Sequence, residues 1–297
     1  MLYLLLAIVF GSLFSVVFKL CQQRGIDTEQ VILFNYVTAL IVTAVPVVCG
    51  LFSASGEYLL PLSSILLTVF QGAMFLLGFV VMNRCTWRSG VALTTVMARA
   101  SLVLPVLLSF LLLEQPSPSW LAVALVIAAM FLLVLPAENE KHDPALLTNK
   151  TDAQRNRLAA LMLVAVFFVY GTSDFTLKVV QSKASGEGQL SSMMTCIFLF
   201  ASVFALCMCF VKGSFKKHPV GWKSLAAGVL LGLINTGCTS CILRALGAMS
   251  TGLFYPLYNV GIVLVATLVG VLFFKEKLKW LQVLGLAVAV AAIALIC

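Results

Sequence analysis

Residues 251–274 of this chain are TGLFYPLYNVGIVLVATLVGVLFF, a run without a single charged side chain. A helix needs about 20 predominantly apolar residues to cross the hydrocarbon core of a bilayer. This run is long enough to do so, and it begins with a glycine and a proline close to polar side chains. The stretch therefore predicts a membrane-spanning helix that carries polar groups into the membrane.

The composition of the whole chain supports the same interpretation. The chain has 297 residues, of which 62% are hydrophobic and 10% charged, and its mean hydropathy is +1.10. Soluble globular proteins average about 45–50% apolar and about 25% charged residues. A chain this apolar is better solvated by lipid than by water. The composition predicts an all-α integral membrane protein.

Apolar runs of membrane-spanning length recur along the chain and are separated by short turns. They predict ten transmembrane helices at 2–19, 31–52, 65–83, 90–113, 120–136, 158–180, 192–211, 225–246, 251–274 and 278–297. The one polar linker of any size, 137–157, divides the chain near its middle.

The two sides of this linker have matching positions. When the second half is slid over the first, Gly90 falls on Gly252 and Glu114 falls on Glu276 without a gap. We therefore expect two five-helix repeats, 1–136 and 158–297, joined by the connecting loop 137–157. Because five is odd, the second copy must cross the membrane in the opposite sense. Inverted repeats of this kind build many secondary transporters, whose substrate site lies between the halves near the midplane.

A family resemblance rests on residues of the second half, which are weakly repeated at Ser89, Gly90, Pro105 and Glu114. These residues are the stretch 251–256, the segment 273–276, Trp280 and Gly285. In this pattern the chain resembles the drug/metabolite transporter superfamily, in its EamA-like ten-helix branch. The resemblance implies a transport fold without naming a cargo. It also implies a central cavity lined by the helices at 2–19, 65–83, 90–113, 158–180, 225–246 and 251–274.

Arg99 is the most deeply placed charge, some ten residues into the expected helix 90–113. A charge at this depth is costly unless it faces a cavity or a partner. Its planar guanidinium could hold a carboxylate or phosphate of a substrate with two hydrogen bonds. The alternative is a structural pair with Asp174 of the expected helix 158–180.

Asp174 itself has two interpretations. It precedes Lys178 by four residues, so the two side chains share a helix face and can pair. If Asp174 faces the cavity instead, it could contact the substrate or exchange a proton. The sequence leaves these alternatives open.

Neutral polar residues form a second candidate set. Pro256 removes a backbone hydrogen bond from the expected helix 251–274, and such interrupted helices commonly form the binding sites of inverted-repeat transporters. The candidate substrate-binding side chains are Tyr255, Tyr258 and Asn259 around Pro256, with Asn235 and Gln71 on other expected cavity helices. Each could equally bridge two helices. Together they favour a polar or amphipathic small molecule.

Other features have structural interpretations. Glu114 and Glu276 are expected to cap helix ends at the membrane surface. The step from Gly228 to Gly232 is expected to let two helices approach closely. Cys238 and Cys241 have the spacing of a metal or redox pair, but no His or carboxylate lies beside them in the sequence. We predict no metal and no cofactor.

Several function classes are disfavoured. The sequence has no zinc-protease, serine-hydrolase or phosphate-binding signature, so we expect no enzyme. The net charge of +8 is dispersed between apolar runs, which argues against nucleic-acid binding. We predict a secondary transporter that exports a small organic metabolite by alternating access, with an amino-acid-like or other anionic or zwitterionic cargo. Its partners would be this substrate, the lipid bilayer and protons, and it would be a monomer or homodimer. The alternatives are a non-transporting membrane subunit or receptor and, less favoured, an intramembrane enzyme.

The distribution of Lys and Arg predicts an orientation in the cell membrane. One side of the expected topology receives 15 of the 19 basic residues, the other receives Lys178, Lys183 and Arg244, and Arg99 lies within a helix. Cytoplasmic loops carry the excess of positive charge. This rule puts both termini outside, whereas analogy with the family puts both inside. We side with the charges, because the bias is present in both halves.

Overall fold

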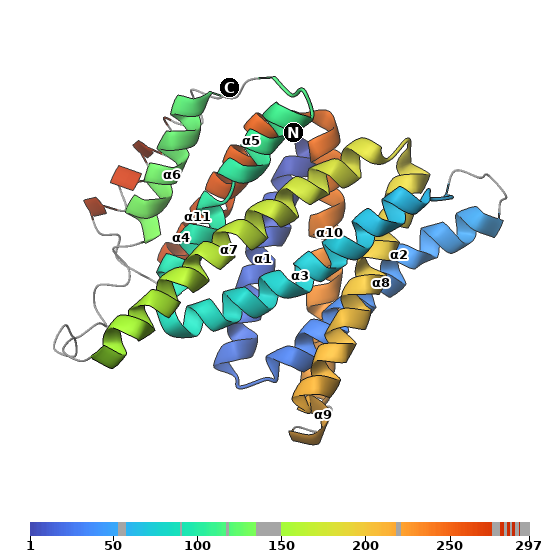
Figure 1. The fold of residues 1–297 in the computed structure, drawn as a ribbon, viewed down its shortest axis with the longest axis horizontal. Helices are drawn as coiled ribbons and strands as arrows, with labels where there is room; N and C mark the ends of the chain where they lie inside the picture. Colours follow the sequence, from blue (N-terminus) through green and yellow to red (C-terminus); the bar gives the residue numbers. More distant parts are fainter. Residues whose placement is uncertain are drawn as a thin grey trace. The chain divides into compact units, whose positions relative to one another are not determined.

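The computed structural model describes residues 1–52, 58–89, 91–116, 119–134, 150–217, 221–274, 280–281, 284–285, 287–288 and 291. Every regular element within these ranges is an α-helix (Figure 1). The helices are α1 (Leu2–Gln23), α2 (Thr28–Phe52), α3 (Leu62–Ser89), α4 (Val91–Ala100), α5 (Val103–Leu112), α6 (Trp120–Val134), α7 (Lys150–Lys183), α8 (Glu187–Lys212), α9 (Ser214–Lys217), α10 (Trp222–Ala248) and α11 (Thr251–Phe274).

Several of these helices are long and apolar enough to span a membrane. Within the described residues, six segments are long and apolar enough to cross a bilayer, and α1 and α11 contain shorter apolar segments. The predicted multi-pass, all-α membrane protein is therefore confirmed. Most of the expected tenth span, 278–297, lies outside the described residues, so the count of ten remains a prediction.

Among the differences from the sequence prediction, two bear on the site. Helix α7 begins at Lys150 rather than at 158, because a helix can extend beyond the apolar run into polar residues. The expected helix 90–113 is divided at Ser101 and Leu102 into α4 and α5. Pro105 has no N–H to donate to the Ser101 carbonyl, which accepts instead from the Leu104 N–H at 2.9 Å. The proline thus tightens one turn in the middle of the span.

The chain forms two compact units, and each combines stretches from both halves of the sequence. The first unit is Met1–Leu76 with Thr176–Ala248, and the second unit is Leu77–Phe175 with Met249–Cys297. The predicted inverted repeat of 1–136 and 158–297 remains a prediction.

In the first unit, α10 packs against α2 and α1, and α8 packs against α2. Glycines permit this closeness. A Cβ at Gly228 would lie 2.3 Å from the Phe34 Cβ, and one at Gly232 would lie 2.6 Å from the Thr38 Cβ. The expectation that these glycines bring two helices together is confirmed.

In the second unit, α11 packs against α5 and α6, and α4 packs against α6. Gly171 of α7 faces the tightened turn between α4 and α5. A Cβ there would lie 2.7 Å from the Leu104 Cβ and 2.9 Å from the Ser101 carbonyl oxygen. Close contact with α7 therefore fixes the position of the turn that follows Arg99.

Many hydroxyl groups bond to their own helices. The side chains of Ser12, Thr43, Ser202 and Thr236 each donate to the carbonyl four residues earlier, at 2.7–2.9 Å. Such bonds satisfy a polar side chain without a partner from another helix.

Candidate substrate-binding site

Arg99 lies in the last turn of α4, directly before the turn that Pro105 tightens. Its Nη1 donates to the Asn259 Oδ1 of α11 at 3.1 Å. A guanidinium carries five N–H donors in a planar fork. Its other donors have no hydrogen-bond acceptor among the described residues, and the side chain is only partly buried. Arg99 is therefore held by one neutral amide and keeps donors for a further acceptor.

Asn259 is in turn held by its own helix. Its Nδ2 donates to the Tyr255 carbonyl at 3.0 Å, and the residue is only 4% exposed. Because Nδ2 is occupied in this way, Oδ1 is the atom presented to Arg99. The orientation of the amide thus follows from α11, near its internal Pro256.

Tyr255 connects α11 to α7. Its hydroxyl donates to the backbone carbonyl of Asp174 at 2.6 Å, and the residue is 1% exposed. The neighbouring rings of Phe254 and Tyr258 stack with centroids 5.4 Å apart and an interplanar angle of 12°. A chain of contacts therefore runs from Arg99 through Asn259 and Tyr255 to α7.

The carboxylate of Asp174 forms no ion pair with Arg99 or Lys178 among the described residues. It lies close enough to Arg99 for the two charges to interact. The Lys178 ammonium donates instead to the Gln181 Oε1 and to the Leu246 carbonyl, each at 2.7 Å. Lys178 therefore caps the end of α10, and the role of the Asp174 carboxylate remains a prediction.

The candidate residues fall into both compact units. Arg99, Asp174, Tyr255, Tyr258 and Asn259 lie in the second unit, whereas Asn235 and Gln71 lie in the first. Asn235 donates its Nδ2 to the Asn35 Oδ1 at 3.3 Å, and Gln71 is fully buried on α3.

Sequence reasoning did not select Phe254 or Ser101, which lie at this site. The stack of Phe254 on Tyr258 follows from their spacing of four residues, which places two rings on one helix face. Pro105 was the signal for the turn at Ser101. Among the described residues, no three His, Cys, Asp or Glu side chains gather in a group that could hold a metal ion.

Three comparisons describe what the chain is similar to. Residues 157–297 match the model of the EamA-like transporter family. An uncharacterized protein of Haemophilus influenzae (strain Rd) is 26% identical, over 98% of this chain and 95% of its own length. A solved crystal structure of a protein has a TM-score of 0.66 at 14% identity, and the likeness covers 99% of this chain and 94% of that one. The last likeness shows a shared fold alone.

Proposed function

We propose, from the premise that residues 157–297 carry the EamA-like transporter family pattern, that this chain is a secondary transporter. The predicted resemblance to that family is confirmed, and it points to a membrane transporter. We further propose that the cargo is a small anionic or zwitterionic organic metabolite, exported by alternating access. The observation that supports it is that Arg99 has one hydrogen-bond partner among the described residues, the neutral amide of Asn259.

A guanidinium with free donors favours a carboxylate or phosphate oxygen. In this proposal Arg99 binds the anionic group of the cargo, while Asn259 holds the guanidinium in position. Tyr255 keeps α11 against α7, and the stacked ring of Tyr258 borders the cargo. Gln71 remains a predicted contributor of hydrogen bonds, whereas Asn235, which donates to Asn35, bridges two helices in this proposal.

Asp174 supplies the proposed coupling to protons. Its carboxylate lies near the Arg99 charge, so a cargo anion at Arg99 would change the electrostatic environment of Asp174. Cargo binding and proton binding would then be linked. A proton gradient could drive export through this linkage.

The predicted orientation completes the proposal. Both termini face outward and the linker 137–157 faces the cytoplasm, as the distribution of Lys and Arg predicts. A cysteine introduced at Asn149 should be shielded from a membrane-impermeant reagent in intact cells. Labelling from outside would show that the termini lie in the cytoplasm.

Solute flux into proteoliposomes tests the function directly. Vesicles that contain the purified chain should exchange radiolabelled amino and organic acids faster than empty vesicles. Arg99→Gln should abolish this flux while the protein still inserts and elutes as a single species. Arg99→Lys keeps the charge without the planar fork and should restore only part of it. Absence of flux with every solute class would favour a receptor or a non-transporting subunit.

A further inference from the structure

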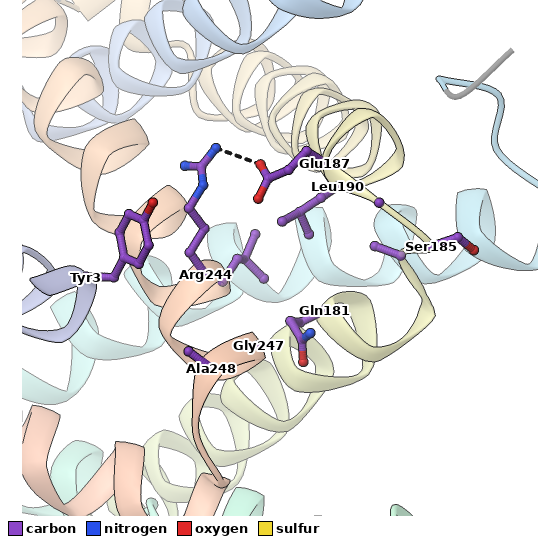
Figure 2. A pocket seen from close by; sticks show the side chains of 11 residues that line it. Tyr3, Gln181, Ser185, Glu187, Leu190, Arg244, Gly247 and Ala248 are labelled. Atoms are coloured by element: carbon purple, nitrogen blue, oxygen red, sulfur yellow. Dashed lines mark hydrogen bonds and ion pairs between the residues drawn. The ribbon is translucent and has the colours of Figure 1, made fainter. Parts of the chain in front are cut away.

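A pocket of about 410 Å³ lies within the first unit. The first turns of α1 and α8 meet the last turns of α7 and α10 there (Figure 2). Its volume falls within the range of about 300–1,000 Å³ that is typical of small-molecule sites. None of its lining residues belongs to the Arg99 site.

Arg244 lines this pocket and lies between Tyr3 and Glu187 (Figure 2). Its Nη2 donates to the Glu187 Oε2 at 2.8 Å, and its Cζ lies 5.9 Å from the centre of the Tyr3 ring. The side chains of Arg244 and Glu187 are 35% and 65% exposed. An ion pair exposed to this degree contributes little to stability. A ligand carboxylate can therefore replace Glu187 on Arg244 at small cost.

The surroundings add a second attraction for a carboxylate. Helix α8 begins after Gly186, which provides no side-chain cap, and the positive end of its dipole faces the pocket. The Gln181 Oε1 already accepts from the Lys178 ammonium, so the Gln181 amide nitrogen remains as a donor at the pocket. Leu190 and Leu243 supply an apolar wall.

We propose that this pocket binds an aliphatic amino acid. Arg244 takes the ligand carboxylate, and the displaced Glu187 takes the ligand ammonium. Among the described residues, one cation and one anion line the pocket, so a ligand that carries both charges leaves neither of them unpaired. A simple carboxylate would satisfy Arg244 but would displace Glu187 without giving it a new partner. The aliphatic side chain lies against Leu190 and Leu243.

The test uses leucine and two molecules that each lack one of its charged groups. These are 4-methylpentanoate, without the amine, and 3-methylbutylamine, without the carboxylate. Binding is measured by saturation-transfer NMR on the full chain in nanodiscs, in an Arg99→Gln background. That background removes the site of the proposed function, so that saturable binding reports on this pocket alone. Failure of the proposed function would appear separately, as unchanged flux in Arg99→Gln.

We expect leucine to bind saturably and more tightly than either molecule with a single charged group. Arg244→Gln should weaken leucine binding about tenfold or more, the typical worth of a charge-assisted hydrogen bond. Glu187→Gln should weaken binding of leucine while leaving 4-methylpentanoate equal or tighter. Glu29→Gln, at the Lys212 ion pair of the same unit, is the matched control and should change neither. Unsaturable leucine binding, or equal binding to the Arg244→Gln variant, would overturn the proposal.

Discussion

Amide side chains within the apolar helices meet different partners in the two compact units. In the first unit, Asn235 donates to Asn35, and Gly232 brings the backbones so close that its Cβ would lie 2.7 Å from the Asn35 carbonyl oxygen. In the second unit, Asn259 accepts from Arg99, whose other donors have no acceptor among the described residues. The first contact joins neutral groups where two helix backbones approach closely. The second holds a charge ready for another partner.

This difference separates packing from binding among residues that look alike in the sequence. A polar side chain at membrane depth must find a hydrogen-bond partner, and another helix can supply one. A hydrogen bond between two polar side chains in the membrane is therefore no evidence of function by itself. A charged group with donors left over indicates a ligand more strongly than a neutral pair does.

The largest expected effect is on stability, at the close contact between α2 and α10 around Gly232. Gly232→Val would place a branched side chain against the Thr38 Cβ and the Asn35 carbonyl, neither of which can rotate away. We expect a loss of more than about 3 kcal/mol in the free energy of unfolding, measured in detergent. Gly221→Ala is the control, because a Cβ there meets nothing within 4 Å. Native stability in Gly232→Val would mean that α2 and α10 are not tightly packed.

The next effect concerns the two amides. Asn259→Leu removes the acceptor for Arg99 and should lower cargo flux about 100-fold, since a partly buried charged donor then loses its hydrogen-bond partner among the described residues. Asn235→Leu should lower stability by about 1 kcal/mol and leave flux within about threefold. Flux in proteoliposomes measures both. Equal losses of flux in the two variants would contradict the proposed difference between the amides. Both would then contact the cargo, as the sequence predicted.

A smaller effect compares two hydroxyls, each of which donates to a backbone carbonyl of another helix. Tyr255→Phe deletes the 2.6 Å bond to Asp174 and should reduce flux about fivefold, because α11 loses one tie to α7. Thr195→Val deletes the 2.8 Å bond to the Thr43 carbonyl. We expect it to cost about 1 kcal/mol of stability with unchanged flux. A flux loss from Thr195→Val alone would mean that this hydroxyl of the first unit, rather than Tyr255 of the second, contributes to transport.

The smallest effect is expected at an exposed ion pair. Glu187→Gln leaves a hydrogen-bonding group beside Arg244 and should change the free energy of unfolding by less than about 0.5 kcal/mol. Chemical denaturation at low and high salt measures this. A larger, salt-sensitive loss would show that the pair is structural, like the buried contacts of the first unit.

The sequence predicted most helices because apolar length is a strong signal. The run 225–246 became α10, Trp222–Ala248, and 251–274 became α11 with the same bounds. Hydropathy says nothing about polar residues outside the bilayer, so the start of α7 at Lys150 was missed. The turn at Ser101 was missed because its cause, Pro105, acts on a residue four positions earlier.

For the site, depth and charge indicated Arg99, but a sequence pattern cannot say which acceptor a guanidinium meets. The proposed pair with Asp174 was one of several alternatives, and the observed hydrogen bond goes to Asn259. Arg244, near the end of the expected helix 225–246, entered the sequence analysis only in the count of basic residues on each side of the membrane. Its place beside Tyr3 depends on helix ends that are far apart in the chain, which local patterns do not encode.

The Asn35–Asn235 contact can form only late in the synthesis of the chain. The two residues are 200 positions apart, so α2 enters the membrane long before α10 exists. At about 5–20 residues per second, a ribosome needs roughly 10–40 s to supply the second amide. Hydroxyls such as Thr43, which bond within their own helix, need no such wait. Nascent α2 must therefore shelter one amide from lipid until the last third of the chain emerges.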